Sequence, residues 1–101
     1  MTRARFRIHW AATAVDDLLE AARFIRREQP VAAQRLYAEM DRLTKLLRTP
    51  PKLGRMVPEF DNPFLRELLV IPYRVIYRIV PPQRSIEVLA VVHSARRLPD
   101  A

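Results

Sequence analysis

The chain has 101 residues, which suits one compact domain and leaves no room for a second hydrophobic core. Half of its residues are apolar and 29% are charged, a balance typical of a folded globular protein rather than a disordered one. It has no cysteine, which excludes disulfides, thiolate nucleophiles and thiolate metal ligands. We expect a reducing, cytoplasmic setting, because the N-terminus lacks the apolar segment of a signal peptide and no apolar run approaches the ~18 residues of a membrane span.

The charge is strongly positive, with a formal net charge of +7 and a pI of about 11.0. Sixteen of the eighteen basic residues are arginine, whose forked guanidinium suits contacts with phosphate and carboxylate. Residues 1–44 carry eight basic and six acidic residues (+2), whereas residues 45–101 carry ten and five (+5). This charge indicates a nucleic acid, a nucleoprotein machine or an acidic protein as partner, although a GC-rich genome would also favour arginine.

No cofactor is expected from the residues. His9 and His93, without cysteines or closely spaced carboxylates, make a poor metal site. A glycine-rich phosphate loop needs more than the single glycine, Gly54. Neither Ser85 nor Ser94 lies in a recognisable nucleophile motif.

The first half of the chain predicts a strand followed by two helices. Residues 5–10 alternate between polar and apolar side chains, which is typical of a half-buried strand. Thr13 is predicted to cap a first amphipathic helix that ends before Pro30. Pro30 can open the second helix, which the Thr49-Pro50-Pro51 run ends. So short a break between the helices predicts an antiparallel hairpin.

The second half predicts a loop and three strands. Residues 50–64 hold four prolines and the only glycine, which indicates a loop. The strands are predicted over Leu65–Ile71, Tyr73–Val80 and Ser85–His93, and the short gaps between them favour antiparallel pairing. On the last strand, simple alternation places Ile86, Val88, Ala90 and Val92 on one face and Glu87, Leu89, Val91 and His93 on the other.

These elements predict a single α+β domain over residues 1–101. Its small antiparallel sheet, in the order strand, helix, helix, strand, strand, strand, would pack one face on the N-terminal helical hairpin. The other face of the sheet is expected to be open and basic, because the middle strand places Arg74 and Arg78 opposite Val75, Tyr77 and Ile79.

Several segments of the chain together resemble the RelE/ParE superfamily, the toxins of type II toxin–antitoxin pairs. The resemblance lies in Gly54-Arg55 within the proline-rich loop, in RELLVIPYRVIYRI (Arg66–Ile79) and in IEVLAVVHSARR (Ile86–Arg97). The segments Trp10–Ile25 and Gln29–Leu36 are similar to the family's first helix and the start of its second. The resemblance implies a small sheet with a helical hairpin on one face, in agreement with the reading from the residues.

The superfamily has two branches, one cleaving mRNA on the ribosome and one resembling ParE, which poisons DNA gyrase. Metal-free RNA cleavage needs a base, an acid and cations around the phosphate. The resemblance offers Arg74 as phosphate-stabilising arginine, and His93, Arg97 and Glu59 could supply the remaining groups. Ribonuclease members typically carry a tyrosine at or soon after the last strand, whereas this chain continues with SARRLPDA. The catalytic set is therefore incomplete, and the His-x-x-Arg-Arg end resembles the gyrase-directed branch.

Our main hypothesis is thus a ParE-like toxin that inhibits gyrase by binding and is neutralised by a cognate antitoxin. The alternatives are a ribosome-dependent endoribonuclease, and an inactive member that binds antitoxin and, only in that complex, operator DNA. The predicted target or nucleic-acid surface consists of Arg55, Arg66, Arg74, Arg78, His93, Arg96 and Arg97. The predicted antitoxin surface is the stripe of apolar residues at helical spacing on the second helix, although most of this stripe is also expected to face the core. Its members are Leu36, Tyr37, Met40, Leu43 and Leu47.

Overall fold

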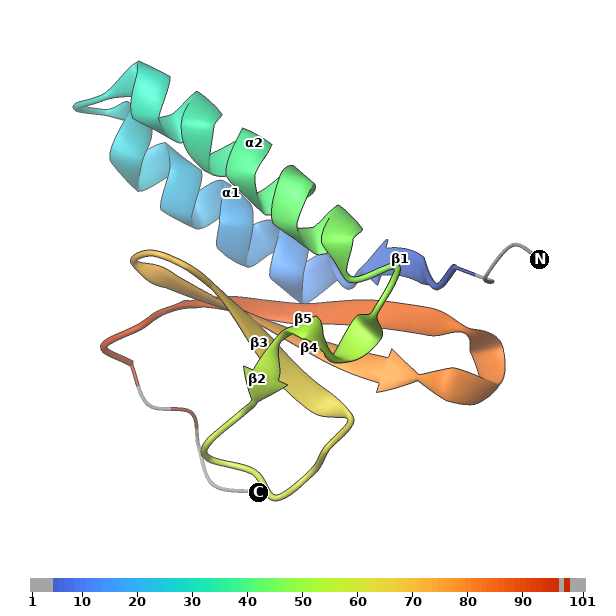
Figure 1. Cartoon of the computed structure of the whole chain (residues 1–101). Coiled ribbons are helices and arrows are strands. Elements are labelled where there is room, and N and C mark those ends of the chain that lie inside the picture. The colour runs from blue at the N-terminus through green and yellow to red at the C-terminus, as the bar shows by residue number, and fades with distance from the viewer. Residues whose placement is uncertain (1–4, 97, 99–101) are drawn as a thin grey trace.

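The computed structural model describes residues 5–96 and Leu98, which form a five-stranded sheet with two helices on one face (Figure 1). The order of elements confirms the predicted α+β fold. Among the described residues, no helix is long and apolar enough to cross a membrane. The elements are β1 (Arg7–Trp10), α1 (Ala12–Arg26), α2 (Pro30–Leu46), β2 (Arg55–Met56), β3 (Leu65–Val70), β4 (Tyr73–Val80) and β5 (Ser85–His93), with short 3-10 turns at Pro51–Leu53 and Pro81–Gln83.

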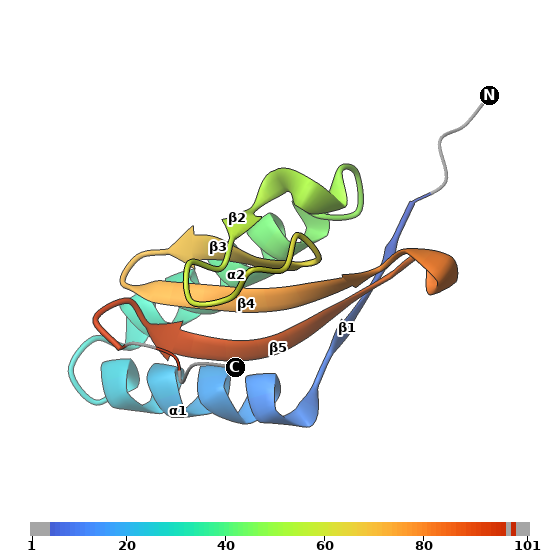
Figure 2. The ribbon, with the colours of Figure 1, turned by 90° about the horizontal axis from the view of Figure 1, so that it is seen from below.

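The strands lie side by side in the order β1-β5-β4-β3-β2. The pairs β3–β4 and β4–β5 are antiparallel, as the short connections predicted, and β2 also pairs antiparallel with β3. β1 instead pairs in parallel with β5, so the sheet is mixed rather than wholly antiparallel. Two parallel strands need a long crossover between them, and the chain between β1 and β5 includes both helices. Figure 2 shows β4 and β5 running side by side.

The helices begin and end close to the predicted positions, but the first cap differs. Pro30 is in the first turn of α2, where a missing N–H costs no hydrogen bond. The residue at the N-cap of α1 is Ala11, whose side chain makes no capping hydrogen bond. The prediction of Thr13 as the cap was wrong: its hydroxyl lies within the first turn and donates to the Leu89 carbonyl at 3.0 Å.

The core lies between the helical hairpin and the sheet. From β4, Val75 and Tyr77 are fully buried and Ile79 almost so, which confirms the predicted apolar face of that strand. Met40 of α2 and Ala14 of α1 contribute from the helix side. The helices thus cover one face of the sheet, and the other face carries charged side chains together with apolar ones such as Ile76.

A bulge in β5 reverses the faces of its second half. Ile76 lies opposite Ala90, but the next residue, Tyr77, lies opposite Val88, so Leu89 is an extra residue. Beyond the bulge Val91 faces the core, with 6% of its surface exposed, and Ala90 turns to the open face. The alternation predicted from the sequence is therefore wrong after Val88, because it allowed for no extra residue.

Helix α1 holds this bulge in place with two side chains one turn apart. Thr13 donates to the Leu89 carbonyl, and the Asp17 carboxylate accepts a hydrogen bond from the Val91 N–H at 3.0 Å. An extra residue leaves backbone groups outside the ladder, and these two bonds satisfy them.

The proline-rich loop is attached to the sheet through Tyr77. Its hydroxyl donates to the Pro51 carbonyl at 2.7 Å and accepts the Gly54 N–H at 2.9 Å. Burial raises the pKa of this hydroxyl above its usual value, which keeps it protonated as a donor. A side chain at Gly54 would collide with the Glu67 carbonyl oxygen and lie 2.7 Å from the Tyr77 hydroxyl, so only glycine fits there.

Candidate functional site

The open face of the sheet carries a buried charge cluster around Arg74. Its guanidinium makes two contacts with Glu59, at 2.6 and 2.8 Å, and two with Glu67, at 2.6 and 3.0 Å. The side chains of these three residues are only 6%, 5% and 0% exposed, in the order Arg74, Glu59 and Glu67. Glu59 comes from the loop after β2, whereas Glu67 and Arg74 come from the neighbouring strands β3 and β4.

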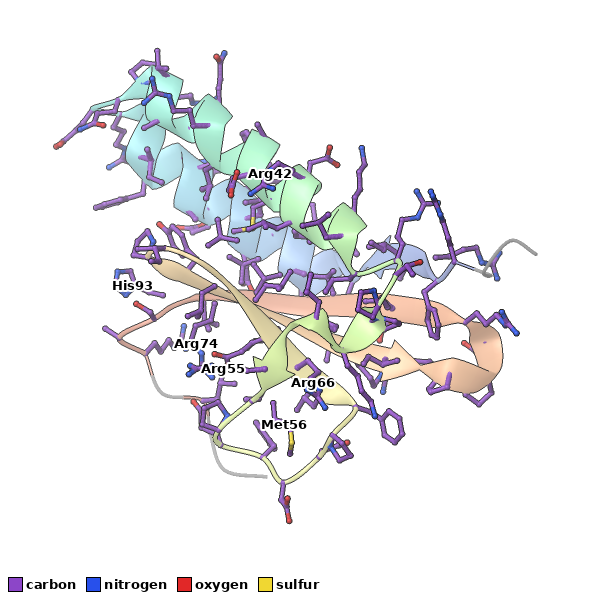
Figure 3. All side chains as sticks on the ribbon, viewed as in Figure 1. Arg42, Arg55, Met56, Arg66, Arg74 and His93 are labelled. Atoms are coloured by element: carbon purple, nitrogen blue, oxygen red, sulfur yellow. The ribbon has the colours of Figure 1, made fainter. Side chains whose placement is uncertain are left out.

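A second arginine completes the cluster. Arg55 of β2 lies opposite Glu67 and binds its other oxygen through two nitrogens, at 2.7 and 2.8 Å. Figure 3 shows Arg55 and Arg74 next to each other on this side of the sheet. Two arginines and two glutamates balance in charge, so the cluster is neutral.

Arg74 is therefore not the solvated, phosphate-facing arginine that the sequence suggested. Its N–H groups point at carboxylates and, through a 3.3 Å bond, at the Arg96 carbonyl. The hydrogen bonds to Glu59, then those to Glu67, hold the pKa of Arg74 above its usual value, so the charge stays fixed in place. A phosphate would have to displace a glutamate to reach it.

Glu59 is likewise unsuited to act as a general base. The hydrogen bonds from Arg74, followed by the one from the Leu98 N–H, lower the pKa of Glu59 from 4.5 to about 2. A carboxylate of so low a pKa accepts a proton from a hydroxyl poorly at neutral pH. Both of its oxygens are also occupied, one by Arg74 alone and one by Arg74 and Leu98.

The same cluster binds the segment after β5, at Arg96 and Leu98, and so attaches it to the proline-rich loop. The Leu98 N–H donates to Glu59 at 2.8 Å, and the Arg96 carbonyl accepts from Arg74. Beside this attachment lies an open pocket of about 400 Å³, between Arg55 and Pro58 on the loop side and Ser94–Arg96 on the other. Arg97, which the sequence assigned to the same surface, lies outside the described residues.

His93 lies on the opposite face of the sheet from Arg74. It pairs with Tyr73, whose side chain is on the helix side, while Arg74 pairs with Val92. The imidazole packs edge-on against Tyr73, with ring centroids 5.8 Å apart, and its Nδ1 accepts the Ala95 N–H. Figure 3 shows His93 apart from the Arg55–Arg74 group. The bulge at Leu89 is the reason, since it reverses the face on which the end of β5 places its side chains.

The remaining predicted arginines do not share one surface either. Arg66 pairs with Tyr77, which places it on the helix-side face, where it donates to the carbonyls of Pro63 and Gly54. Arg78 is on the open face and binds Glu87 at 2.6 Å. The predicted grouping of Arg66 with Arg74 and Arg78 on one face was therefore wrong.

Burial also divides the predicted antitoxin stripe on α2. Leu36, Met40 and Leu47 are 8%, 1% and 0% exposed and belong to the core under the helix. Leu43 is partly buried against the same core, and Tyr37 is the exposed member, at 39%. Three of the five side chains are thus out of reach of a partner in this conformation.

Sequence reasoning missed Glu67, although a signal for it was present. Only Ile71 and Pro72 separate β3 from β4, so Val70 lies opposite Tyr73 and Leu69 opposite Arg74. Glu67 and Leu69 are two residues apart and share a face, which brings Glu67 next to Arg74. Among the described residues, no group of three or more His, Cys, Asp or Glu could hold a metal ion.

Comparison with known proteins gives consistent results. A family model described as "ParE toxin of type II toxin-antitoxin system, parDE" matches residues 8–98. A relative from Sinorhizobium fredii named "Putative toxin Y4kP" is 33% identical over 98 residues, which span 95% of this chain and 96% of that protein.

Two solved structures share the fold. The chromosomal ParDE system from P. aeruginosa superposes with a TM-score of 0.71 at 19% identity, covering 90% of this chain and 98% of that one. The toxin–antitoxin complex RelBE2 from Mycobacterium tuberculosis gives a TM-score of 0.61 at 20% identity, covering 94% and 98%. The family match spans nearly the whole described sheet and both helices, so this chain belongs to the ParE toxins of type II toxin–antitoxin systems.

Proposed function

We propose that this toxin acts by binding its target, DNA gyrase, and not by cutting RNA. The observation that carries the proposal is the state of Arg74, which is enclosed by Glu59 and Glu67 instead of facing a substrate. Cleavage would need a cation for the phosphate and proton-transfer groups within reach of it. Here the cation is neutralised, the carboxylate beside it has a pKa of about 2, and His93 is on the other face of the sheet.

The end of β5 and the segment after it are the proposed target-binding part. His93 and Arg96 are exposed there, and the bonds of Arg96 and Leu98 to the charge cluster fix the path of the chain. In this arrangement Arg74 and Glu59 are positioning residues: they hold the segment that meets the target and do not touch the target themselves.

The partner that silences the toxin is proposed to be a cognate antitoxin bound to the helical hairpin. The P. aeruginosa structure is of a ParDE toxin–antitoxin system and the M. tuberculosis structure is of a toxin–antitoxin complex, which supports such a partner. Large apolar side chains remain exposed on the two helices: Val15, Leu19, Phe24, Val31, Tyr37 and Leu46. Covering two or three of them fully would contribute ~1.5–3 kcal/mol each before ordering costs.

The test is to produce the toxin alone and follow two activities in parallel. Purified gyrase should lose supercoiling activity in the presence of the toxin, and mRNA ends in producing cells should be unchanged. The His93→Ala variant separates the two mechanisms, because it removes the histidine at the end of β5 without touching the charge cluster: gyrase inhibition should weaken only mildly, whereas complete loss of activity would argue for catalysis. Cuts at ribosomal A-site codons with normal supercoiling would overturn the proposal in favour of the endoribonuclease. Neither effect, with normal growth, would favour an inactive member.

A further inference from the structure

Four exposed arginines without an ion pair among the described residues lie together at the end of the molecule opposite the charge cluster. There the start of β1, the end of α2 and the turn between β4 and β5 meet, on the right of Figure 1. Two backbone bonds join the three segments: the Phe6 N–H donates to the Arg48 carbonyl at 3.1 Å, and the Arg7 N–H to the Arg84 carbonyl at 2.9 Å. We call the exposed cations there the basic end, which consists of Arg5, Arg7, Lys45, Arg48 and Arg84.

Almost nothing at the basic end balances this charge. Among the described residues, its four arginines make no ion pair, and the one acid that lines the surface, Asp41, is already bound to Lys45 at 2.9 Å. The arginines of the open face differ, since Arg55, Arg74 and Arg78 each bind a glutamate. Like charges held together on a surface repel one another, and a polyanion removes that repulsion.

Arg84 adds a second, independent observation. It lies in the left-handed conformation, with φ 47° and ψ 49°, at the turn after Pro81–Gln83. Residues with a bulky side chain are uncommon there, and glycine or asparagine adopts this conformation more readily. The backbone conformation of the turn therefore does not favour arginine at this position. The positive charge and the forked donors of the guanidinium, however, suit contacts with an anionic partner.

Arg48 lies at the centre of the basic end, where it lines two hollows of the surface. Two shallow hollows of about 440 and 450 Å³ lie on either side of Arg48, the first reaching Arg84 and the second Arg7 and Lys45. The aromatic rings nearby, Phe6 and Trp10, are half-buried against the core. Single-stranded nucleic acid gains much of its binding free energy from bases that stack on exposed aromatic rings, and these two rings are not fully exposed. Contacts with the phosphate backbone of a duplex do not need such rings and are therefore favoured.

We propose that the basic end binds the phosphate backbone of duplex DNA without regard to sequence. This goes beyond the proposed action on gyrase and does not depend on it, because it uses the opposite end of the molecule. The toxin would then contact DNA phosphates directly, whereas the sequence predicted DNA binding only through the complex with the antitoxin.

The experiment measures the affinity of the full chain, made by cell-free synthesis, for a short mixed-sequence DNA duplex over a range of salt concentrations. The test variant carries Arg7→Gln, Arg48→Gln and Arg84→Asn, which removes three charges and leaves asparagine at the left-handed position. Each phosphate contact contributes a slope of about 0.9 to the plot of log affinity against log salt. The variant should therefore lose about 0.9 per arginine, so that between about 50 and 200 mM salt the wild-type affinity falls roughly 40-fold more than that of the variant.

The matched control carries Arg23→Gln, Arg26→Gln and Arg27→Gln, three exposed arginines around the end of α1 with the same total charge. It should keep the wild-type slope, and thermal unfolding should show that both variants are folded. If the triple variant does not fold, the double variant Arg7→Gln, Arg48→Gln should lose about 1.8 of the slope. Equal losses in test and control variants would overturn the proposal, as would binding of single-stranded RNA or of an acidic peptide with no binding of the duplex.

Discussion

Arg74 is the residue on which the open face of the sheet depends. It lies between two carboxylates with 6% of its side chain exposed; among the described residues Glu59 makes its ion pair with Arg74 alone, whereas Glu67 also binds Arg55. Removing one partner of a buried ion pair leaves the other charged and desolvated, which costs more than the pair itself contributes.

We expect Arg74→Ala to lower the free energy of unfolding at neutral pH by about 3–5 kcal/mol, because Glu59 and Glu67 would be left buried and adjacent. Urea denaturation measures the change. Arg78→Ala is the control, since its pair with Glu87 is largely exposed and such pairs contribute at most about 1 kcal/mol. A loss no greater than that of the control would mean that water reaches the cluster.

The low pKa of Glu59 predicts how stability depends on acid. Its pKa is about 2 in the folded chain against an ordinary 4.5, so the folded state favours the ionised form. The stabilisation is therefore fully present above pH 4.5 and is lost as the pH falls through about 2. In Glu59→Gln, unfolding followed by circular dichroism should show a weaker pH dependence in this window. An unchanged profile would assign the acid sensitivity to other carboxylates.

At the scale of elements, the sequence predicted the helical hairpin and the three C-terminal strands because their apolar periodicities differ clearly. It could not predict the bulge, because residues 88–92 read VLAVV, and five apolar side chains satisfy either register. The choice between registers is made by α1, through Thr13 and Asp17, and periodicity within β5 carries no information about that contact. One extra residue then moves His93 to the helix side, which is why the predicted grouping of His93 with Arg74 on one face was wrong.

The hydrogen bond between Asp17 and the bulged part of β5 gives this carboxylate a specific role. Asp17→Ala removes the acceptor of the Val91 N–H, so we expect the free energy of unfolding to fall by about 1–2 kcal/mol and amide exchange at Val91 to accelerate. The neighbouring Asp16 is exposed, and Asp16→Ala is the matched control, with little expected effect. If both variants exchange Val91 equally fast, the carboxylate does not hold the bulge.

At the scale of the whole molecule, the proposed target-binding segment and the basic end are at opposite ends of the sheet. An arginine is available to a partner only if it does not already bind a glutamate of the same chain. Whether it does so depends on contacts between segments that are far apart in the sequence. Arg74 meets Glu59 only because a loop folds back over the sheet, which composition and spacing do not reveal. The basic end was missed for the same reason, since its members lie between positions 5 and 84 and become neighbours only in the fold.

Separate ends predict separable effects. The variant with Arg7→Gln, Arg48→Gln and Arg84→Asn should bind DNA more weakly while inhibiting gyrase and binding the antitoxin within about 2-fold of the wild type. Supercoiling assays and calorimetry with the antitoxin measure the two retained properties. A parallel loss of gyrase inhibition would show that both ends belong to one target surface.

The position of β5 has a further consequence for how the toxin is made. The last strand to be synthesised lies between β1 and β4, so β1 has no partner until residues 85–93 have left the ribosome. A nascent or truncated chain that stops before Ser85 has two unpaired strand edges and an incomplete core, the state in which chains aggregate or are degraded. The sheet of this toxin therefore closes only after residues 85–93 are available, so folding of the domain waits for β5 and cannot be completed by the segments before it.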